Sequence, residues 1–132
     1  MKFLTWEKVL LLVRYSLGIA FVWFGILKLF NASPVTALIN NVISPFSFPM
    51  EIPLIGLFEV FVGIGFFTKR FIKVSSVLMI CYLIVITILV LLRQGFSPWF
   101  PLLTFEGEFV IKNLVLISAG LVLLTSSSSL QK

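Results

Sequence analysis

The sequence contains no histidine, and Cys81 is its single cysteine. The chain therefore offers no set of nitrogen and sulfur ligands for a metal ion and no C-x-x-C couple, and it can form no intramolecular disulfide. Cys81 lies inside an apolar run, where we expect it to have a structural role. Any redox chemistry would need a partner protein or a bound organic cofactor, because this chain alone can neither exchange a dithiol nor hold haem.

Charged residues are also scarce: they make up 11% of the 132 residues, whereas 60% are hydrophobic. A soluble domain of this size and composition would expose a large apolar surface to water, so we expect the apolar side chains to meet lipid. The formal net charge is +5, but the basic residues occur singly or in short clusters and form no basic face. This distribution argues against nucleic-acid binding.

Four apolar stretches account for most of the chain, at residues 9–30, 52–67, 74–92 and 109–125. A helical span needs about 20 apolar residues, and a lipid-facing segment must satisfy its backbone groups internally. The sequence therefore predicts an all-α fold, a four-transmembrane-helix bundle in which residues 1–132 form a single membrane domain. We interpret the first stretch as a retained span rather than a secretory signal peptide, since it carries charges and lacks a clear small-residue cleavage site.

The basic residues indicate how these spans are oriented. Lys2 and Lys8 precede the first stretch, the basic segment 69–73 joins the second to the third, and a lysine ends the chain. Cytoplasmic connections are enriched in lysine and arginine. We therefore expect both termini in the cytoplasm and the connections 31–51 and 93–108 on the outer side.

The first outer connection has a helical pattern of its own. Ser33 can cap a helix that begins at Pro34, and apolar residues then recur at helical spacing. We expect a short interfacial helix on the outer membrane surface, with Thr36, Asn40 and Asn41 on its polar face.

Small and charged residues share one face on two of the expected spans. In the first span they are separated alternately by four and three residues, as in Arg14, Gly18, Phe21, Gly25 and Lys28. In the second span a similar stripe is formed by Gly56, Glu59 and Gly63. Small residues let helices approach closely and charged residues avoid lipid, so we expect both stripes to face other helices.

The last span adds polar residues at a similar depth, because Glu108 and Lys112 lie four residues apart on one face and Asn113 is adjacent. The candidate site is therefore an intramembrane polar cluster that joins three spans, with Arg14 as a further candidate. Its members are Lys28, Glu59, Glu108, Lys112 and Asn113. We assign no catalytic residue and no metal ligand.

The charged residues also have simpler interpretations. Lys28 can reach the outer interface, Arg14 can reach the cytoplasmic headgroups, and Lys112 can pair with Glu108 on its own helix. Glu59 fits such an interpretation less well, because its side chain is short and an unpaired buried carboxylate costs several kcal/mol. We expect Glu59 to be paired or protonated inside the bundle, and the pairing can be purely structural.

Three longer segments carry these stripes: R-Y-S-L-G-I-A-F-V-W-F-G-I-L-K-L-F at residues 14–30, I-G-L-F-E-V-F-V-G-I-G at 55–65, and L-T-F-E-G-E-F-V-I-K-N-L-V-L-I-S-A-G-L-V-L at 103–123. They resemble the first, second and fourth spans of DoxX-like and YkgB-like small integral membrane proteins, whereas the third expected span matches only in hydrophobicity. The shared positions would be Arg14, Gly18, Gly25, Lys28, Gly56, Glu59, Gly63, Glu106, Gly107, Lys112 and Asn113.

The resemblance implies a multi-pass protein of a bacterial inner (cytoplasmic) membrane, with relatives linked to thiosulfate:quinone oxidation and to resistance against oxidants. It implies no defined reaction. We expect a noncatalytic membrane subunit or accessory of a redox or oxidative-stress system, associated with quinone or lipid and without another cofactor. The expected partners are membrane lipid and a redox partner protein, with a homo-oligomer as a further option.

Two alternatives come from other functional classes. A small proton-coupled carrier or permease would use Glu59 as the group that changes protonation, with Lys28 or Lys112 as its counter-ion. An enzyme acting on a lipid or quinone would use Glu59 as an acid or base, but no pair of nucleophile and base supports it.

Overall fold

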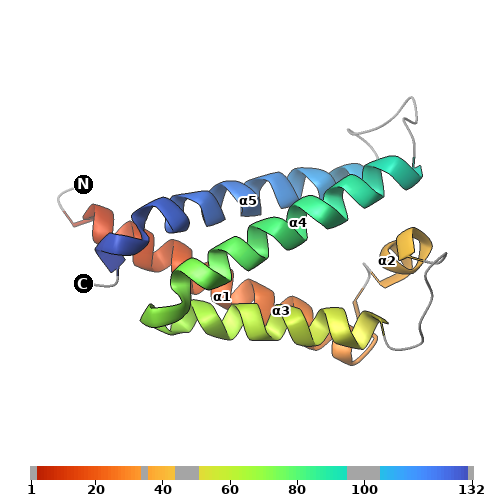
Figure 1. The fold of residues 1–132 in the computed structure, drawn as a ribbon, viewed down its shortest axis with the longest axis horizontal. Helices are drawn as coiled ribbons and strands as arrows, with labels where there is room; N and C mark the ends of the chain where they lie inside the picture. Colours follow the sequence, from red (N-terminus) through yellow and green to blue (C-terminus); the bar gives the residue numbers. More distant parts are fainter. Residues whose placement is uncertain (1–2, 34–35, 44–50, 95–104, 131–132) are drawn as a thin grey trace.

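The computed structural model describes residues 3–33, 36–43, 51–94 and 105–130. In chain order its elements are α1 (Trp6–Leu29), α2 (Thr36–Ile43), α3 (Glu51–Phe67), the 3-10 turn η2 (Lys69–Phe71), α4 (Ile72–Gln94) and α5 (Phe105–Leu130) (Figure 1). The described residues contain no strand, so the predicted all-α class is confirmed for this part of the chain.

Within the described residues, three helical segments are long and apolar enough to cross a membrane: Trp6–Leu29, Lys69–Leu92 and Gly107–Ser128. At about 1.5 Å per residue, each exceeds the roughly 30 Å of a hydrocarbon core. The stretch predicted at 52–67 also forms a helix, but α3 has 17 residues and is only about 26 Å long.

A left-handed residue ends α1 and turns the chain toward α2. Asn31 has a φ of 52°, a conformation that asparagine tolerates better than most residues. The amide of Asn31 donates to the carbonyl of Lys28 at 3.1 Å, and the amide of Ala32 donates to the carbonyl of Leu27 at 2.8 Å. This pair of bonds is a Schellman motif, and it satisfies carbonyls that the helix end would otherwise leave without a partner.

The four long helices pack side by side. Helix α1 packs against α3 and α5, and α4 packs against the same two helices (Figure 1). The start of α1, the end of α5 and the η2 turn lie at one end of the molecule, and α2 lies at the other. Successive long helices therefore run in opposite directions.

Two hydrophobic clusters fill the space between the helices. The larger one contains Leu10, Leu17, Phe21, Val62, Phe66, Ile72, Met79, Leu83 and Leu123. The smaller one lies toward α2 and contains Leu38, Ile86, Val90, Phe109 and Val110. The candidate polar residues lie where these two clusters meet: they line one cavity together with members of the larger cluster, such as Leu83, and of the smaller cluster, such as Ile86.

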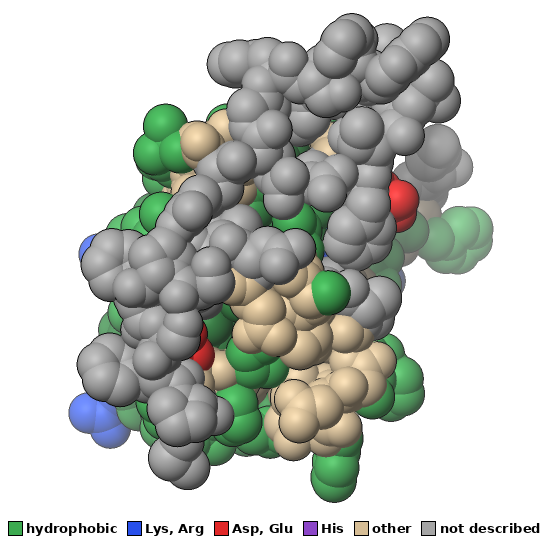
Figure 2. Space-filling view, turned by 90° about the vertical axis from the view of Figure 1, so that its right-hand side faces the viewer, with side chains coloured by type: hydrophobic (Ala, Val, Ile, Leu, Met, Phe, Trp, Pro, Cys, Tyr) green, Lys and Arg blue, Asp and Glu red, His purple; other side chains and the backbone are tan. Residues whose placement is uncertain are grey.

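The outer faces of the helices are apolar as well. Large side chains such as Trp23, Phe61 and Val85 are more than half exposed, and in Figure 2 hydrophobic side chains project from several sides of the outline. Cys81 is also exposed, so α4 directs it outward and not into the core. Such a surface suits contact with lipid acyl chains.

The predicted short helix is present as α2, which contacts α3 and α4. Leu38 and Ile39 are buried, whereas Asn40 is exposed as the amphipathic pattern predicts. Thr36 departs from the expected polar face: its Oγ1 is buried and has no hydrogen-bond partner among the described residues. The side chain of Asn41 lies outside the described part of the chain.

Candidate functional site

Glycines bring α1 and α3 into close contact beside the candidate site. Gly25 lies against the carbonyl oxygen of Gly56, and a Cβ atom added to Gly56 would lie 2.8 Å from the carbonyl oxygen of Gly25. Two turns away, a Cβ atom added to Gly63 would lie 2.9 Å from the carbonyl oxygen of Gly18. Real Cβ atoms essentially never approach within 3.0 Å, so a side chain at these positions would push the two backbones apart.

Lys28, in the last turn of α1, forms a buried ion pair with Glu59 of α3. The Lys28 Nζ lies 2.6 Å from the Glu59 Oε2, and the two side chains are 5% and 4% exposed. Helical side chains lean toward the start of their own helix, so both reach the level of Gly25 and Gly56, where the backbones are closest. Removing one partner of such a pair would leave a buried charge, at a cost of about 3–5 kcal/mol.

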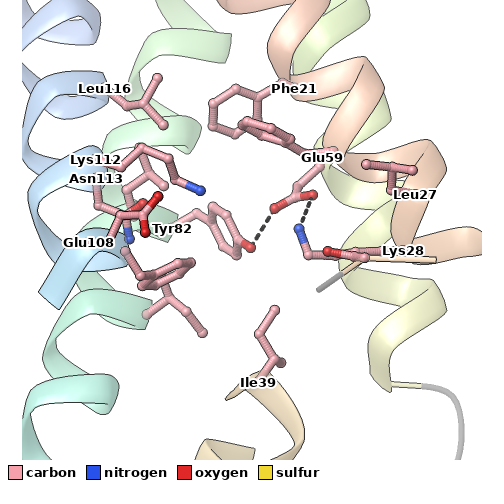
Figure 3. Close-up of a pocket in the computed structure, with 15 residues that line it drawn as sticks. Phe21, Leu27, Lys28, Ile39, Glu59, Tyr82, Glu108, Lys112, Asn113 and Leu116 are labelled. Atoms are coloured by element: carbon pink, nitrogen blue, oxygen red, sulfur yellow. Dashed lines mark hydrogen bonds and ion pairs between the residues drawn. The ribbon is translucent and has the colours of Figure 1, made fainter. Parts of the chain in front are cut away.

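Tyr82 of α4 binds the other oxygen of the same carboxylate. Its hydroxyl donates to the Glu59 Oε1 at 2.7 Å (Figure 3). Its ring lies 5.5 Å from the ring of Phe58, centroid to centroid. Both oxygens of Glu59 therefore accept a hydrogen bond from a neighbouring helix. This arrangement ties α1, α3 and α4 together through one side chain.

Sequence reasoning did not select Tyr82 as a site residue. One feature of the sequence could have identified it: Tyr82 is the only tyrosine in the apolar stretch 74–92. A buried tyrosine hydroxyl usually needs a hydrogen-bond partner, so an isolated tyrosine in such a stretch indicates a polar group on a facing helix.

Lys112 of α5 points into the same space from the opposite side (Figure 3). Its Nζ lies 4.9 Å from the ring centroid of Phe24 on α1 and 5.1 Å from that of Phe109. Each such contact with a ring is worth about 0.5–2 kcal/mol. Among the described residues, no carboxylate lies within 4.0 Å of this Nζ. The same-helix pair with Glu108 is therefore not formed, and Glu108 is exposed.

Asn113 lies next to Lys112 but bonds to α4. Its Nδ2 donates to the Oγ1 of Thr87 at 3.0 Å, and both side chains are buried. The bond joins α4 to α5 beside the cluster. Thr87 is a second residue that the sequence analysis did not select.

These side chains surround a cavity of about 210 Å³, to which all five α-helices contribute. The five residues of the predicted cluster all line it. Its other lining residues are Phe21, Phe24, Leu27, Ser33, Ile39, Tyr82, Leu83, Ile86, Phe109 and Leu116. Polar groups thus converge within largely apolar walls, which is the usual composition of a small-molecule site.

Arg14 lies toward the other end of α1 and does not line this cavity. Its Nε donates to the carbonyl oxygen of Phe66, and its Nη2 donates to that of Phe67 at 2.6 Å. Both carbonyls belong to the last turn of α3, where they lack partners within the helix and carry its partial negative charge. Arg14 is 1% exposed, so it caps α3 from inside the fold and does not extend to the headgroups.

The arrangement suits ligand binding better than bond breaking. The carboxylate that a proton transfer would use is held by two donors, whereas Lys112 faces open space with apolar walls around it. The described residues thus define an all-helical protein with three helices able to cross a membrane and an internal polar cavity.

No family model, curated protein or solved structure matches this chain. The resemblance to DoxX-like proteins therefore stays a prediction from the sequence.

Proposed function

We propose that this chain is an integral membrane protein in which α3 is a fourth transmembrane helix, so that α1, α3, α4 and α5 form a four-transmembrane-helix bundle. Helix α3 packs between α1 and α4 and exposes Leu57, Phe61 and Ile64. A span somewhat shorter than the hydrocarbon core can be accommodated by local thinning of the bilayer.

The proposed orientation places both termini in the cytoplasm. Four exposed basic residues support it, because Lys8 lies in the first turn of α1 and the others lie at or next to η2, at the same end of the molecule: Lys69, Arg70 and Lys73. An excess of lysine and arginine marks the cytoplasmic side. The cavity then lies in the outer half of a bacterial inner membrane, the location that the family resemblance implies.

We further propose that the chain is a DoxX-like, noncatalytic subunit or accessory of a membrane redox or oxidative-stress system, and that its cavity holds a quinone or a lipid. One observation carries this proposal: a cavity inside the helices combines a lysine and a tyrosine hydroxyl with apolar walls. A quinone carbonyl or a lipid headgroup would accept a hydrogen bond from Lys112, while the Tyr82 hydroxyl, which donates to Glu59, holds the cavity wall in place, and the chain of either ligand would contact the apolar side chains.

The geometry favours this proposal over a proton-coupled carrier. To exchange a proton, Glu59 would have to release the Lys28 ammonium or the Tyr82 hydroxyl, each within 2.7 Å of it. Such bonds fix the helices and position the cavity wall. A carrier would still show a flux in liposomes that Glu59→Gln abolishes, and silent liposomes would count against it.

The proposal is tested by purifying the full chain in a mild detergent and identifying the bound small molecules and proteins by mass spectrometry. We expect the wild type to retain a quinone or lipid in near-stoichiometric amount, together with a redox partner protein. Glu59→Gln should lose the small molecule, because the amide cannot hold both Lys28 and Tyr82 in place.

Two further variants keep this test decisive. Glu7→Gln makes the same change on an exposed residue at the other end of α1 and should retain the ligand. Tyr82→Phe removes one hydroxyl, keeps the ion pair and should lower retention even if Glu59→Gln fails to fold. Wild-type protein that carries no small molecule would rule out the ligand-binding role.

A further inference from the structure

We propose that the cavity binds the anionic headgroup of a single-chain membrane amphiphile, such as a fatty-acid carboxylate, and that Lys112 is the residue that contacts it. This inference rests on the proposed ligand-binding function and narrows it from quinones and lipids in general to one charge class. Lys112 would supply the attraction, and the Lys28–Glu59–Tyr82 group would form a fixed wall.

The described part of the cavity wall carries one positive charge that no ion pair neutralises. Lys28 and Glu59 neutralise each other at 2.6 Å, and the Tyr82 hydroxyl takes the remaining carboxylate oxygen. Lys112 is then the one ammonium in the described lining without a carboxylate within 4.0 Å. Glu108 also lines the cavity, but its side chain is exposed, so solvent or headgroups screen its charge.

Leaving the Lys112 ammonium without an anionic partner costs free energy. A partly buried ammonium loses hydration, and the faces of Phe24 and Phe109 replace only part of it, because a ring attracts an ammonium less strongly than the lost water oxygens did. A charge-assisted hydrogen bond to an anion is stronger than a hydrogen bond to a neutral acceptor. An anionic ligand therefore satisfies Lys112 better than a neutral carbonyl does.

The volume of the cavity limits how much of a ligand it can enclose. A cavity of about 210 Å³ is smaller than the 300–1,000 Å³, roughly, that encloses a drug-sized ligand. It has room for a headgroup and the first carbons of a chain. The buried Ile39 of α2 lies at one end of the cavity (Figure 3), and the half-buried Phe24 of α1 and Leu116 of α5 also line it. The rest of the chain would leave between those two helices, toward lipid.

The test measures binding of radiolabelled oleate to the purified full chain in a nonionic detergent. Unlabelled oleate, oleyl alcohol, a decyl quinone, acetate and inorganic phosphate serve as competitors. We expect saturable binding of oleate, displacement by unlabelled oleate at far lower concentration than by oleyl alcohol, and no displacement by acetate or phosphate.

Four variants test whether the charge of Lys112 is what binds the anion. Lys112→Gln should weaken oleate binding at least about tenfold, and Lys112→Arg should restore most of it. Glu108→Gln should change oleate binding far less than Lys112→Gln does, because the charge of the exposed Glu108 is screened. Lys69→Gln makes the same change on exposed η2, at the other end of the molecule, and should leave binding unchanged.

The outcomes separate this inference from the broader proposal. Quinone binding that Lys112→Gln leaves intact, with oleate no better than oleyl alcohol, would overturn the inference and keep the ligand-binding function. Displacement of oleate by acetate or phosphate at comparable concentration would assign the site to a free anion and overturn the membrane source. A protein that binds none of the probes would remove both proposals.

Discussion

The two charged residues of the α1 stripe, Arg14 and Lys28, have the same pattern in sequence but different surroundings in the fold. Each lies in α1 beside a glycine that packs against α3, and each is buried. Arg14 donates to main-chain carbonyls at the end of α3, away from the cavity, whereas Lys28 pairs with the side chain of Glu59 and lines the cavity.

The two residues differ in the groups that accept their hydrogen bonds. Arg14 satisfies the last carbonyls of α3, which any sequence would leave without partners at that point, so its role is to hold a helix end. Lys28 is paired with an acidic side chain that also binds Tyr82, next to open volume. Burial of a charge is common to both ends of the stripe, and the cavity is what marks one of them as a candidate site.

The largest expected effect comes from breaking the ion pair. Lys28→Met should lower the free energy of unfolding by about 3–5 kcal/mol, because Glu59 would be left as a buried charge. The double variant Lys28→Met/Glu59→Met should recover most of that loss, since two apolar groups of similar volume replace the pair. Unfolding by dodecyl sulfate in mixed micelles measures both, with exposed Lys8→Met as the control. Equal losses of unfolding free energy in the single and double variants would show that the unpaired charge of Glu59 is not the cause of the loss.

The second effect tests whether close backbone contact brings the pair together. Gly56→Leu should cost about 3 kcal/mol, at the upper end for overpacking, because the added atoms meet the backbone of Gly25 and the Cβ of Lys28, the latter at 3.0 Å. The same measurement applies, with Ser16→Leu on the exposed side of α1 as the control. If Gly56→Leu left the free energy of unfolding unchanged, α1 and α3 could move apart without loss of stability.

The third effect separates stability from ligand binding. Arg14→Met should destabilise the fold by about 1.5–3 kcal/mol, because two carbonyls lose charge-assisted hydrogen bonds. Ligand retention in mild detergent should nevertheless equal that of the wild type, since Arg14 does not line the cavity. Exposed Arg70→Met is the matched control. Loss of ligand in Arg14→Met but not in Arg70→Met would contradict the view that Arg14 only holds the end of α3 while Lys28 belongs to the ligand site.

The sequence predicted the helices and the faces better than it predicted the contacts between them. Periodicity identifies residues that share one face of a helix, so the stripes of α1 and α3 could be recognised. It does not reveal how far one helix is shifted along its neighbour, and that shift decides that Lys28 meets Glu59 while Lys112 stays apart. The partners of Arg14 are main-chain carbonyls, which no residue type marks in a sequence.

Helix α4 shows most clearly that contacts between helices cannot be predicted from the periodicity of one helix. Between residues 77 and 92 it is apolar almost throughout, and the two polar residues there that bond to other helices, Tyr82 and Thr87, form no repeated stripe. Their partners, Glu59 and Asn113, lie on two other helices, so only the packed structure connects them. For Glu106, which the family resemblance includes, the side chain lies outside the described part of the chain.

The smallest expected effect concerns the Asn113–Thr87 bond beside the cavity. Thr87→Val keeps the shape of the side chain and removes the hydroxyl, so it should cost only about 0.6 kcal/mol, the average for a polar contact between helices in a membrane. Thr125→Val is the matched control, because Thr125 is exposed and its Oγ1 bonds within its own helix. If Thr87→Val instead cost as much as Lys28→Met, the α4–α5 contact would be as important to the site as the α1–α3 ion pair. The contrast between the two ends of α1 would then be secondary to the bonds that α4 makes to its neighbours.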